Sequence, residues 1–168
     1  MRRSGVLLPV TSLPSRFGIG TFSKEAYAFV DFLKEAGQKL WQILPLGPTG
    51  YGDSPYQAFS TFAGNPYLID LEELIENGWL TEEECENTDW GGSKSYVDYE
   101  KMYQGRFPLL RKAYHNSHIA ENAEFIAFCE ENDWWLSDYA LFMAIKDSQG
   151  GASFLEWDAP LKLREPEA

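Results

Sequence analysis

The stretch that decides the fold is WQILPLGPTGYGDSPYQAFSTFAGNPYLID, residues 41–70. It begins within an apolar run, residues 40–46, of a kind typical of a strand buried on both faces. The residues that follow are rich in glycine and proline, which excludes a helix or a simple hairpin. These breakers are Gly47, Pro48, Gly50, Gly52, Pro55, Gly64 and Pro66. We therefore expect a strand that leads into a long, irregular loop.

This loop places flat aromatic rings beside short polar side chains. The aromatic residues are Tyr51, Tyr56, Phe59, Phe62 and Tyr67, and the polar ones are Asp53, Ser54, Gln57, Ser60 and Asn65. A pyranose ring has apolar C–H faces that stack on aromatic rings, and hydroxyls that bind amides, hydroxyls and carboxylates. The composition of the loop therefore indicates a sugar-binding surface.

Each of these side chains also has a purely structural interpretation. Phe59 and Phe62 stand among small residues, which favours packing over ligand contact. Tyr51 and Tyr56 lie beside glycine and proline, so we expect both rings to be exposed. The residues alone leave open whether those two rings contact a ligand. Asp53 follows a glycine, which favours a turn-forming or supporting role over catalysis.

The chain before the loop has the pattern of a βαβ unit. Residues 5–13, GVLLPVTSL, predict a buried strand that turns into a polar loop. Ser23 is a candidate helix N-cap, apolar residues follow at helical spacing, and Gly37 is a candidate stop. Residues 39–44 form the second predicted strand. Because a crossover of this length joins parallel neighbours, the predicted fold class is α/β.

The rest of the chain is predicted to be mainly helical. Asp70 is a candidate N-cap of a short helix, and Thr81 begins a capping box with the glutamate three residues later. A helical pattern starts near residue 98, and Pro108 should kink or divide that helix. Separate helices are expected over residues 123–131 and 133–146.

Composition and charge exclude several classes of function. The net charge of −12 argues against nucleic acid and anionic membrane partners, because phosphate groups bind basic surfaces. The apolar run after the basic N-terminus stops at Pro9, which is too short for a signal peptide, and no transmembrane run follows. Cys85 and Cys129 are far apart, which argues against a disulfide framework or a zinc site. We expect a cytoplasmic protein with a neutral ligand.

Motifs for cofactors and metals do not occur in the sequence. Neither GxGxxG nor GxxxxGK[ST] is present, so no cofactor is predicted. GxSxG and HExxH are missing too, and the two histidines, His115 and His118, fall in or just after a helix. We expect both histidines at the surface and predict neither a metal site nor a histidine-based hydrolase.

Carboxylates are the remaining candidates for chemistry. Retaining glycosyl transfer uses two of them, a nucleophile and an acid/base, about 5 Å apart. In a parallel β/α protein such groups project from the C-terminal ends of strands. Asp53 lies at that end, but no second carboxylate has a matching position. The sequence therefore offers a sugar-binding surface without a visible catalytic pair.

Three segments of the chain carry long and specific motifs. They are SGVLLPVTSLPSRFGIG at residues 4–20, AGQKLWQILPLGPTGYGDSPYQAFSTFAGNPYLIDL at residues 36–71, and WLSDYALFMAIKD at residues 135–147. These segments resemble the N-terminal part of the 4-α-glucanotransferases, the amylomaltase or disproportionating-enzyme family, glycoside hydrolase family 77. The resemblance covers nearly the whole chain.

The resemblance implies a (β/α)₈ barrel of the TIM type that is incomplete in this chain. Residues 6–9 and 40–44 would be its first strands. Residues 1–70 would hold the first βαβ and the substrate-binding loop, and residues 71–150 a mainly helical insertion. Residues 151–168 would be an irregular tail, which has no clear period and is expected to be poorly packed. A closed barrel typically takes about 250 residues, more than this chain has.

The resemblance also implies transfer of an α-1,4-glucan segment to glucose or another glucan, with retention through a covalent glycosyl-enzyme. The partners would be maltooligosaccharides and the dextrins of starch or glycogen. By position, Tyr56 matches the tyrosine beneath the sugar at the cleavage point, and Ser54 lies beside it. Tyr51 matches an aromatic of a second glucan groove, where Tyr99 is the candidate that pairs with it. Asp53 completes the set of candidate substrate-binding residues.

The chain departs from the family in length. The family's nucleophile, acid/base and third acidic residue belong to later blocks that this sequence does not contain, so no catalytic residue is predicted here. We expect the isolated 168-residue chain to be inactive. Two alternatives stay open: a non-catalytic glucan-binding module, and an inactive fragment that associates with itself through unpaired barrel edges.

Overall fold

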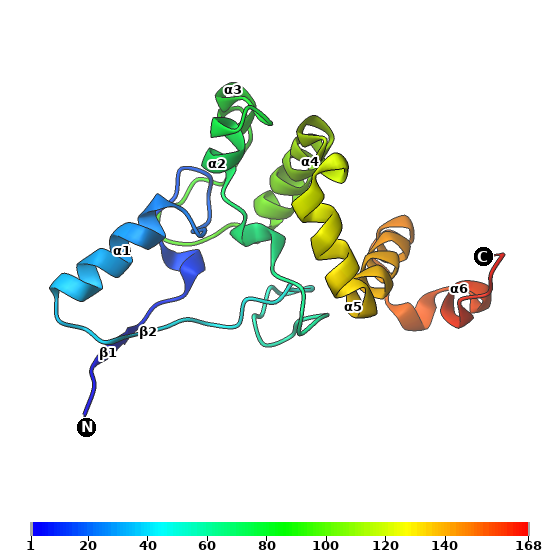
Figure 1. The fold of residues 1–168 in the computed structure, drawn as a ribbon, viewed down its shortest axis with the longest axis horizontal. Coiled ribbons are helices and arrows are strands. Elements are labelled where there is room, and N and C mark those ends of the chain that lie inside the picture. The colour runs from blue at the N-terminus through cyan, green and yellow to red at the C-terminus, as the bar shows by residue number, and fades with distance from the viewer. Residues whose placement is uncertain (1, 168) are drawn as a thin grey trace. The chain divides into compact units, whose positions relative to one another are not determined.

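The protein is described by a computed structural model that covers residues 2–167 and forms two compact units, Met1–Ile119 and Ala120–Ala168. The regular elements of the first unit are β1 (Gly5–Leu7), η1 (Val10–Ser12), α1 (Lys24–Glu35), β2 (Leu40–Gln42), η2 (Pro66–Leu68), α2 (Leu71–Glu76), α3 (Glu82–Glu86) and α4 (Tyr99–Ser117) (Figure 1). The short turn η3 (Ile119–Glu121) leads into α5 (Ala123–Ser148), η4 (Phe154–Glu156) and α6 (Ala159–Leu163). The three-part division predicted from the sequence stays a prediction.

The first unit begins with a βαβ arrangement. β1 and β2 form a parallel pair in which Gly5 lies opposite Leu40, and α1 connects the two strands (Figure 1). This pairing confirms the predicted βαβ unit. Ser23 precedes α1 as expected, although its hydroxyl donates to Glu25 instead of accepting a backbone N–H. Gly37 has a φ of 72°, which places the predicted helix stop in the left-handed region that glycine favours.

The prediction that these strands are buried is wrong. Every residue of β1 is exposed, and Leu7 and Leu40 are 57% and 52% exposed. A strand is buried only when other elements cover its faces, and within residues 2–167 the sheet consists of β1 and β2 alone. The apolar run therefore predicted the strand correctly, but it did not predict whether other elements pack on its faces.

Helix α4 is continuous through Pro108. The sequence predicted either a kink or a division there, and the division does not occur. Proline removes one backbone hydrogen bond and clashes with the preceding turn. The helix is nevertheless anchored on both sides of Pro108 by buried residues of one face, which are Met102, Arg106, Leu109 and Ala113. Tertiary packing of that face outweighs the local cost of the proline.

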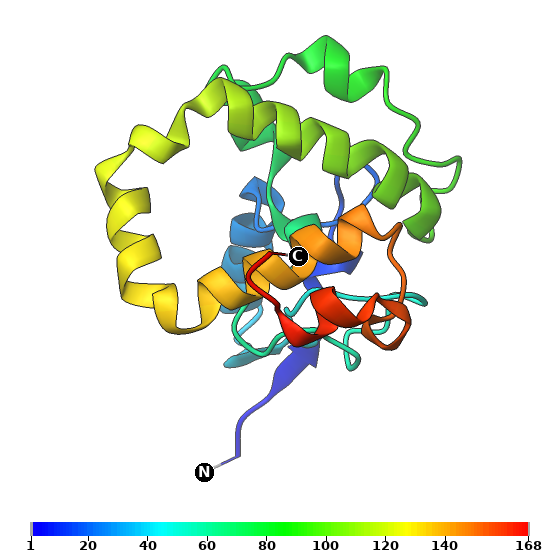
Figure 2. The same ribbon diagram turned by 90° about the vertical axis from the view of Figure 1, so that its right-hand side faces the viewer.

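The second unit is built around one long helix instead of the two that were predicted. α5 is continuous over Ala123–Ser148 and bends strongly between its yellow N-terminal part and its orange C-terminal part (Figure 2). The Asn132 side chain donates to the Phe128 carbonyl and accepts from the Trp135 indole, so its polar groups are satisfied within the helix.

The C-terminal tail is also more regular than predicted, since it contains η4 and α6. Trp157 is 4% exposed, and its ring lies 5.3 Å from that of Phe142.

The buried core of the first unit connects the loop after β1 to α4. Ile19 and Tyr67 pack with Met102 of α4, and Phe17 packs in a neighbouring cluster with Leu71 and further residues of α2 to α4.

Two helix caps predicted from the sequence are confirmed: the Asp70 side chain accepts from the backbone of α2, and Thr81 forms the capping box of α3. No helix within residues 2–167 has the length and apolar character needed to span a membrane.

Candidate functional site

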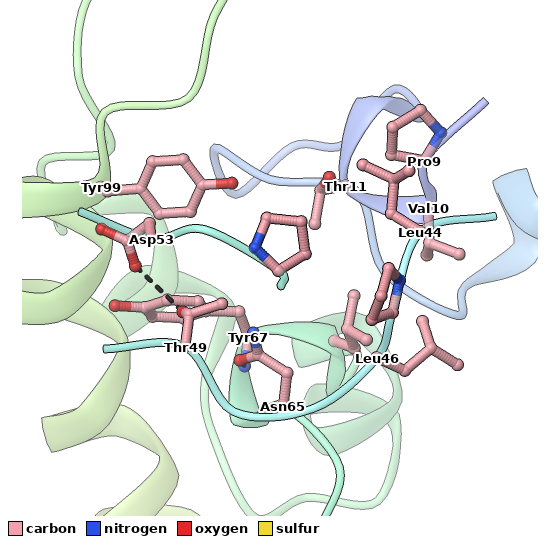
Figure 3. Close-up of a pocket in the computed structure, with 13 residues that line it drawn as sticks. Pro9, Val10, Thr11, Leu44, Leu46, Thr49, Asp53, Asn65, Tyr67 and Tyr99 are labelled. Atoms are coloured by element: carbon pink, nitrogen blue, oxygen red, sulfur yellow. Dashed lines mark hydrogen bonds between the residues drawn. The ribbon is translucent and has the colours of Figure 1, made fainter. Parts of the chain in front are cut away.

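A small cavity lies where the loops after β1 and β2 meet the first turn of α4 (Figure 3). Its volume is about 90 Å³, whereas sites that enclose a small ligand measure roughly 300 Å³ or more. Its lining residues are Pro9, Val10, Thr11, Leu44, Pro45, Leu46, Thr49, Asp53, Pro55, Asn65, Tyr67, Leu68 and Tyr99. The cavity has an apolar end with Pro9 and Val10 and a polar end with Asp53 and Tyr99 (Figure 3).

Asp53 forms the turn at the polar end. It adopts the left-handed conformation with φ 49°, and its backbone N–H donates to the Gly50 carbonyl at 3.0 Å. The Thr49 hydroxyl donates to Asp53 Oδ1 at 3.1 Å. Burial raises the pKa of the Asp53 carboxyl, and the hydrogen bond from Thr49 partly opposes that rise. Asp53 is therefore both a turn-former and the one carboxylate among the residues that line the cavity.

The two tyrosines that were expected to be exposed are exposed. The side chain of Tyr51 is fully accessible, and Tyr56 is 73% exposed. Neither ring is among those that line the cavity. The Ser54 hydroxyl accepts the backbone N–H of Tyr56 at 3.4 Å, so it supports the turn that presents Tyr56. What these three side chains do toward a ligand stays a prediction.

The phenylalanines of the loop have a packing role at one position. An added Cβ on Gly50 would stand 2.7 Å from Cζ of Phe59, so the ring of Phe59 covers this glycine. Phe59 is still 43% exposed, and Phe62 is 58% exposed. A side chain at position 50 would therefore have to displace the outer end of the Phe59 ring.

Tyr99 is the first residue of α4 and lines the cavity, where Thr11 and Asp53 also lie (Figure 3). Burial raises the pKa of the Tyr99 hydroxyl, and the negative charge of Asp53 adds to the rise. The structure thus brings Tyr99 together with Asp53. Its predicted pairing with Tyr51 stays a prediction, because Tyr51 lies outside the cavity lining.

Sequence reasoning named Tyr67 among the aromatic residues of the loop but did not select it as a candidate substrate-binding residue. Its side chain is 5% exposed, lines the cavity, and lies with its ring centroid 6.0 Å from that of Tyr99. Burial and then the charge of Asp53 raise the pKa of its hydroxyl. The signal that could have located it is Asn65, whose side chain accepts the Tyr67 N–H at 2.9 Å and fixes η2.

The described residues hold no group of three or more His, Cys, Asp and Glu side chains that could bind a metal ion. His115 and His118 are both exposed, as predicted. Cys85 and Cys129 are free thiols. The residues around the cavity therefore offer hydroxyls, an amide, one carboxylate and apolar surface. These groups can contact a polyhydroxylated ligand, but they do not supply the two carboxylates of retaining glycosyl transfer.

The fold and site define an α/β protein in which an aromatic and polar loop follows a parallel strand. The chain belongs to the 4-alpha-glucanotransferase family, glycoside hydrolase family 77, whose sequence model matches residues 8–168. This membership confirms the resemblance seen in the sequence.

Named relatives and a solved structure agree with this family. The chain is 49% identical over 171 residues to the 4-alpha-glucanotransferase of Thermus thermophilus, a match that covers 99% of this chain and 33% of that protein. It is 48% identical over 158 residues to the enzyme of Clostridium butyricum, with 94% of this chain and 32% of that protein covered. The chain thus spans about a third of the length of the curated relatives it matches.

The three-dimensional comparison gives the same result. The structure of an amylomaltase from Streptococcus agalactiae in complex with acarbose superimposes with a TM-score of 0.90 and 46% sequence identity. The match covers 99% of this chain and 34% of that one. The backbone described here is therefore closely similar to the corresponding third of that amylomaltase.

Proposed function

We propose that this chain supplies part of the substrate-binding surface of a 4-α-glucanotransferase that acts on α-1,4-glucans. Tyr56 and Ser54 lie under the reacting sugar, and Tyr51 and Tyr99 contribute to an accessory glucan groove. Asp53 accepts hydrogen bonds from sugar hydroxyls. The observation that carries this proposal is the exposure of Tyr51 and Tyr56 on a fixed loop in a chain of this family.

The physical support comes from the way the loop is built. Exposed aromatic rings are effective ligand contacts when their backbone is already ordered, because little conformational entropy is then lost on binding. The turn at Asp53, closed by the hydrogen bond from Thr49, and the bridge between Thr49 and Ala58 order this backbone. The cavity beneath the loop is too small to enclose a sugar ring, so the glucan lies across the open surface of the loop.

The chemistry requires groups that these residues do not provide. Retaining transfer needs a nucleophile and an acid/base about 5 Å apart. Asp53 is the one carboxylate among the lining residues, and Thr49 engages one of its oxygens. We assign it to substrate binding, and the catalytic pair to polypeptide outside these 168 residues.

The exposure of apolar elements also supports the proposal that these 168 residues are one part of a larger enzyme. α5 has no buried residue, and Ile126, Phe128 and Leu141 on it are each more than 40% exposed. All of β1 and, in β2, Leu40 and Gln42 are also exposed. In the proposed arrangement β1 and β2 are the first strands of a (β/α)₈ barrel, and further polypeptide of the family fold covers these surfaces. The matched relatives are 4-alpha-glucanotransferases, so a separate non-catalytic binding module has no support.

The test replaces the matched third of the Thermus thermophilus enzyme by these 168 residues and measures glucose release from maltotriose. We expect the chimera to disproportionate maltotriose and the isolated chain to release no glucose. A folded chimera without activity would contradict the proposed function. Turnover by the isolated chain would contradict the assignment of the catalytic carboxylates to other residues.

A further inference from the structure

A buried arginine on α4 joins the segments that form the cavity. Arg106 is fully buried, and its two terminal nitrogens donate to backbone carbonyls: Nη1 to Phe17 at 3.5 Å, and Nη2 to Ile69. Its Nε is the buried side-chain nitrogen that has no hydrogen-bond partner among the described residues. Arginine is rarely buried completely, so a specific arrangement must hold this cation in place.

The carboxylate of Asp70 partly offsets the buried positive charge of Arg106. Burial lowers the pKa of the guanidinium to about 10, and the negative charge of Asp70 opposes that change. Asp70 in turn caps α2 through the Glu72 N–H at 3.2 Å and accepts from the Thr21 hydroxyl at 3.4 Å. Arg106 and Asp70 therefore lie where the loop after β1, the start of α2 and α4 meet.

The ring pair of the cavity, Tyr67 and Tyr99, belongs to η2, which precedes α2, and to the first turn of α4. Tyr67 precedes Ile69 by two residues, and its ring lies 6.0 Å from that of Tyr99 and 5.7 Å from that of Phe107. Because Tyr99 and Phe107 are two turns apart on α4, Tyr67 contacts the helix along its axis. The hydrogen bond from Arg106 to the Ile69 carbonyl fixes the position of α4 along its own axis relative to Tyr67. The bond to Phe17 fixes α4 against the loop that follows Thr11.

We propose that Arg106 is a positioning residue for glucan binding: it holds α4 in the register that places the rings of Tyr67 and Tyr99 at the polar end of the cavity with Asp53. This inference rests on the proposed function. Met102, Leu109 and Ala113 bury the same face of α4 through hydrophobic contacts, which are non-directional, whereas the hydrogen bonds of Arg106 are directional. The planar fork of arginine reaches two carbonyls at once, which a lysine ammonium at the same position cannot reproduce.

The first test uses the isolated chain and needs no activity. Fluorotyrosine labels report the ring environments of Tyr67 and Tyr99 by fluorine NMR, with assignment by Tyr→Phe variants. We expect Arg106→Lys to shift both resonances. Ala113→Gly is the matched control, since it weakens the same buried face of α4 two turns further along without touching either carbonyl. It should leave both resonances in place.

The second test measures kinetics in the Thermus thermophilus chimera. Arg106→Lys should raise KM for maltotriose roughly tenfold with kcat within about twofold, because a displaced binding surface weakens ground-state and transition-state binding alike. Ala113→Gly should leave KM unchanged. Arg106→Gln, which keeps a planar amide donor, serves as the second variant.

These outcomes separate the two proposals. An inactive parent chimera counts against the proposed function, while the fluorine resonances still test Arg106. Unchanged resonances and unchanged KM in folded Arg106→Lys would overturn the positioning role. Equal changes in Ala113→Gly would overturn it too. If both Arg106 variants fail to fold while Ala113→Gly folds, Arg106 only stabilises the chain, and the positioning role is wrong.

Discussion

The Thr49 hydroxyl donates a 3.1 Å hydrogen bond to the carboxylate of Asp53, four residues later in the loop after β2. The bond closes a turn in which Asp53 is left-handed, and Thr49 also pairs with Ala58 in an isolated antiparallel bridge. A loop rich in glycine thus has a defined backbone. The ordered backbone presents Tyr51 and Tyr56 as exposed side chains.

The conformation of Asp53 leads to a prediction that separates its backbone role from its charge. Asp53→Asn should fold normally, because asparagine tolerates the left-handed region, whereas Asp53→Ala should lose about 1 kcal/mol of unfolding free energy. Both variants should weaken binding of maltoheptaose to the chimera, roughly tenfold, through loss of the carboxylate. Isothermal titration and urea unfolding give the two quantities. Full affinity in Asp53→Asn would show that the carboxylate does not contact the glucan.

The exposed tyrosines of the loop are predicted to contribute stacking. Tyr51→Ala and Tyr56→Ala should each weaken maltoheptaose binding by about 1 kcal/mol and leave stability unchanged, since both rings are exposed. Tyr27 on α1 is a matched control, because it is 74% exposed against 73% for Tyr56. An equal loss of affinity in Tyr27→Ala would argue against a specific role for the loop.

Tyr67 is predicted to be the residue of the site on which stability depends most. Its ring is buried against Tyr99 and Phe107, so Tyr67→Ala should cost about 3–5 kcal/mol of unfolding free energy. Tyr67→Phe keeps the ring and should cost much less. Urea unfolding followed by tryptophan fluorescence measures both. A small loss in Tyr67→Ala would mean that the ring pair does not hold α4 in place.

Acid should destabilise the first unit through Glu84. The Lys112 ammonium and the Thr81 backbone N–H lower the pKa of this carboxyl from 4.5 to about 2. Because the unfolded chain binds this proton more tightly, the contribution of Glu84 is fully present above about pH 4.5 and is lost as the pH falls toward about 2. Lys112→Met should flatten the dependence of the urea midpoint on pH in this window. Lys39→Met removes the same charge from the connection before β2 and should leave the slope unchanged.

The exposed apolar surfaces predict self-association of the isolated chain. α5 and the two strands expose apolar side chains, and an unpaired strand edge can pair with another chain. Sedimentation velocity should therefore show a size distribution that shifts with concentration. Phe128→Glu together with Leu141→Glu should reduce that shift. A chain that stays monomeric at every concentration would count against the prediction.

Local patterns were enough to predict several elements. The caps at Asp70 and Thr81 and the stop at Gly37 depend on residues a few positions apart, so the sequence contains all that decides them. The exposure of Tyr51 and Tyr56 follows in the same way from adjacent glycine and proline. Of the two outcomes predicted at Pro108, a kink or a division, the division does not occur, because a buried face of α4 packs on distant residues and outweighs one proline.

What the sequence by itself determined is the βαβ start, the irregular loop with its exposed tyrosines, and membership of the 4-alpha-glucanotransferase family. Only the tertiary structure decided which side chains share the cavity and which apolar residues lie open. The contact of Arg106 with Phe17 spans 89 residues, and that of Tyr67 with Tyr99 joins a loop to a helix. Such contacts depend on how helices pack, and no local periodicity specifies them.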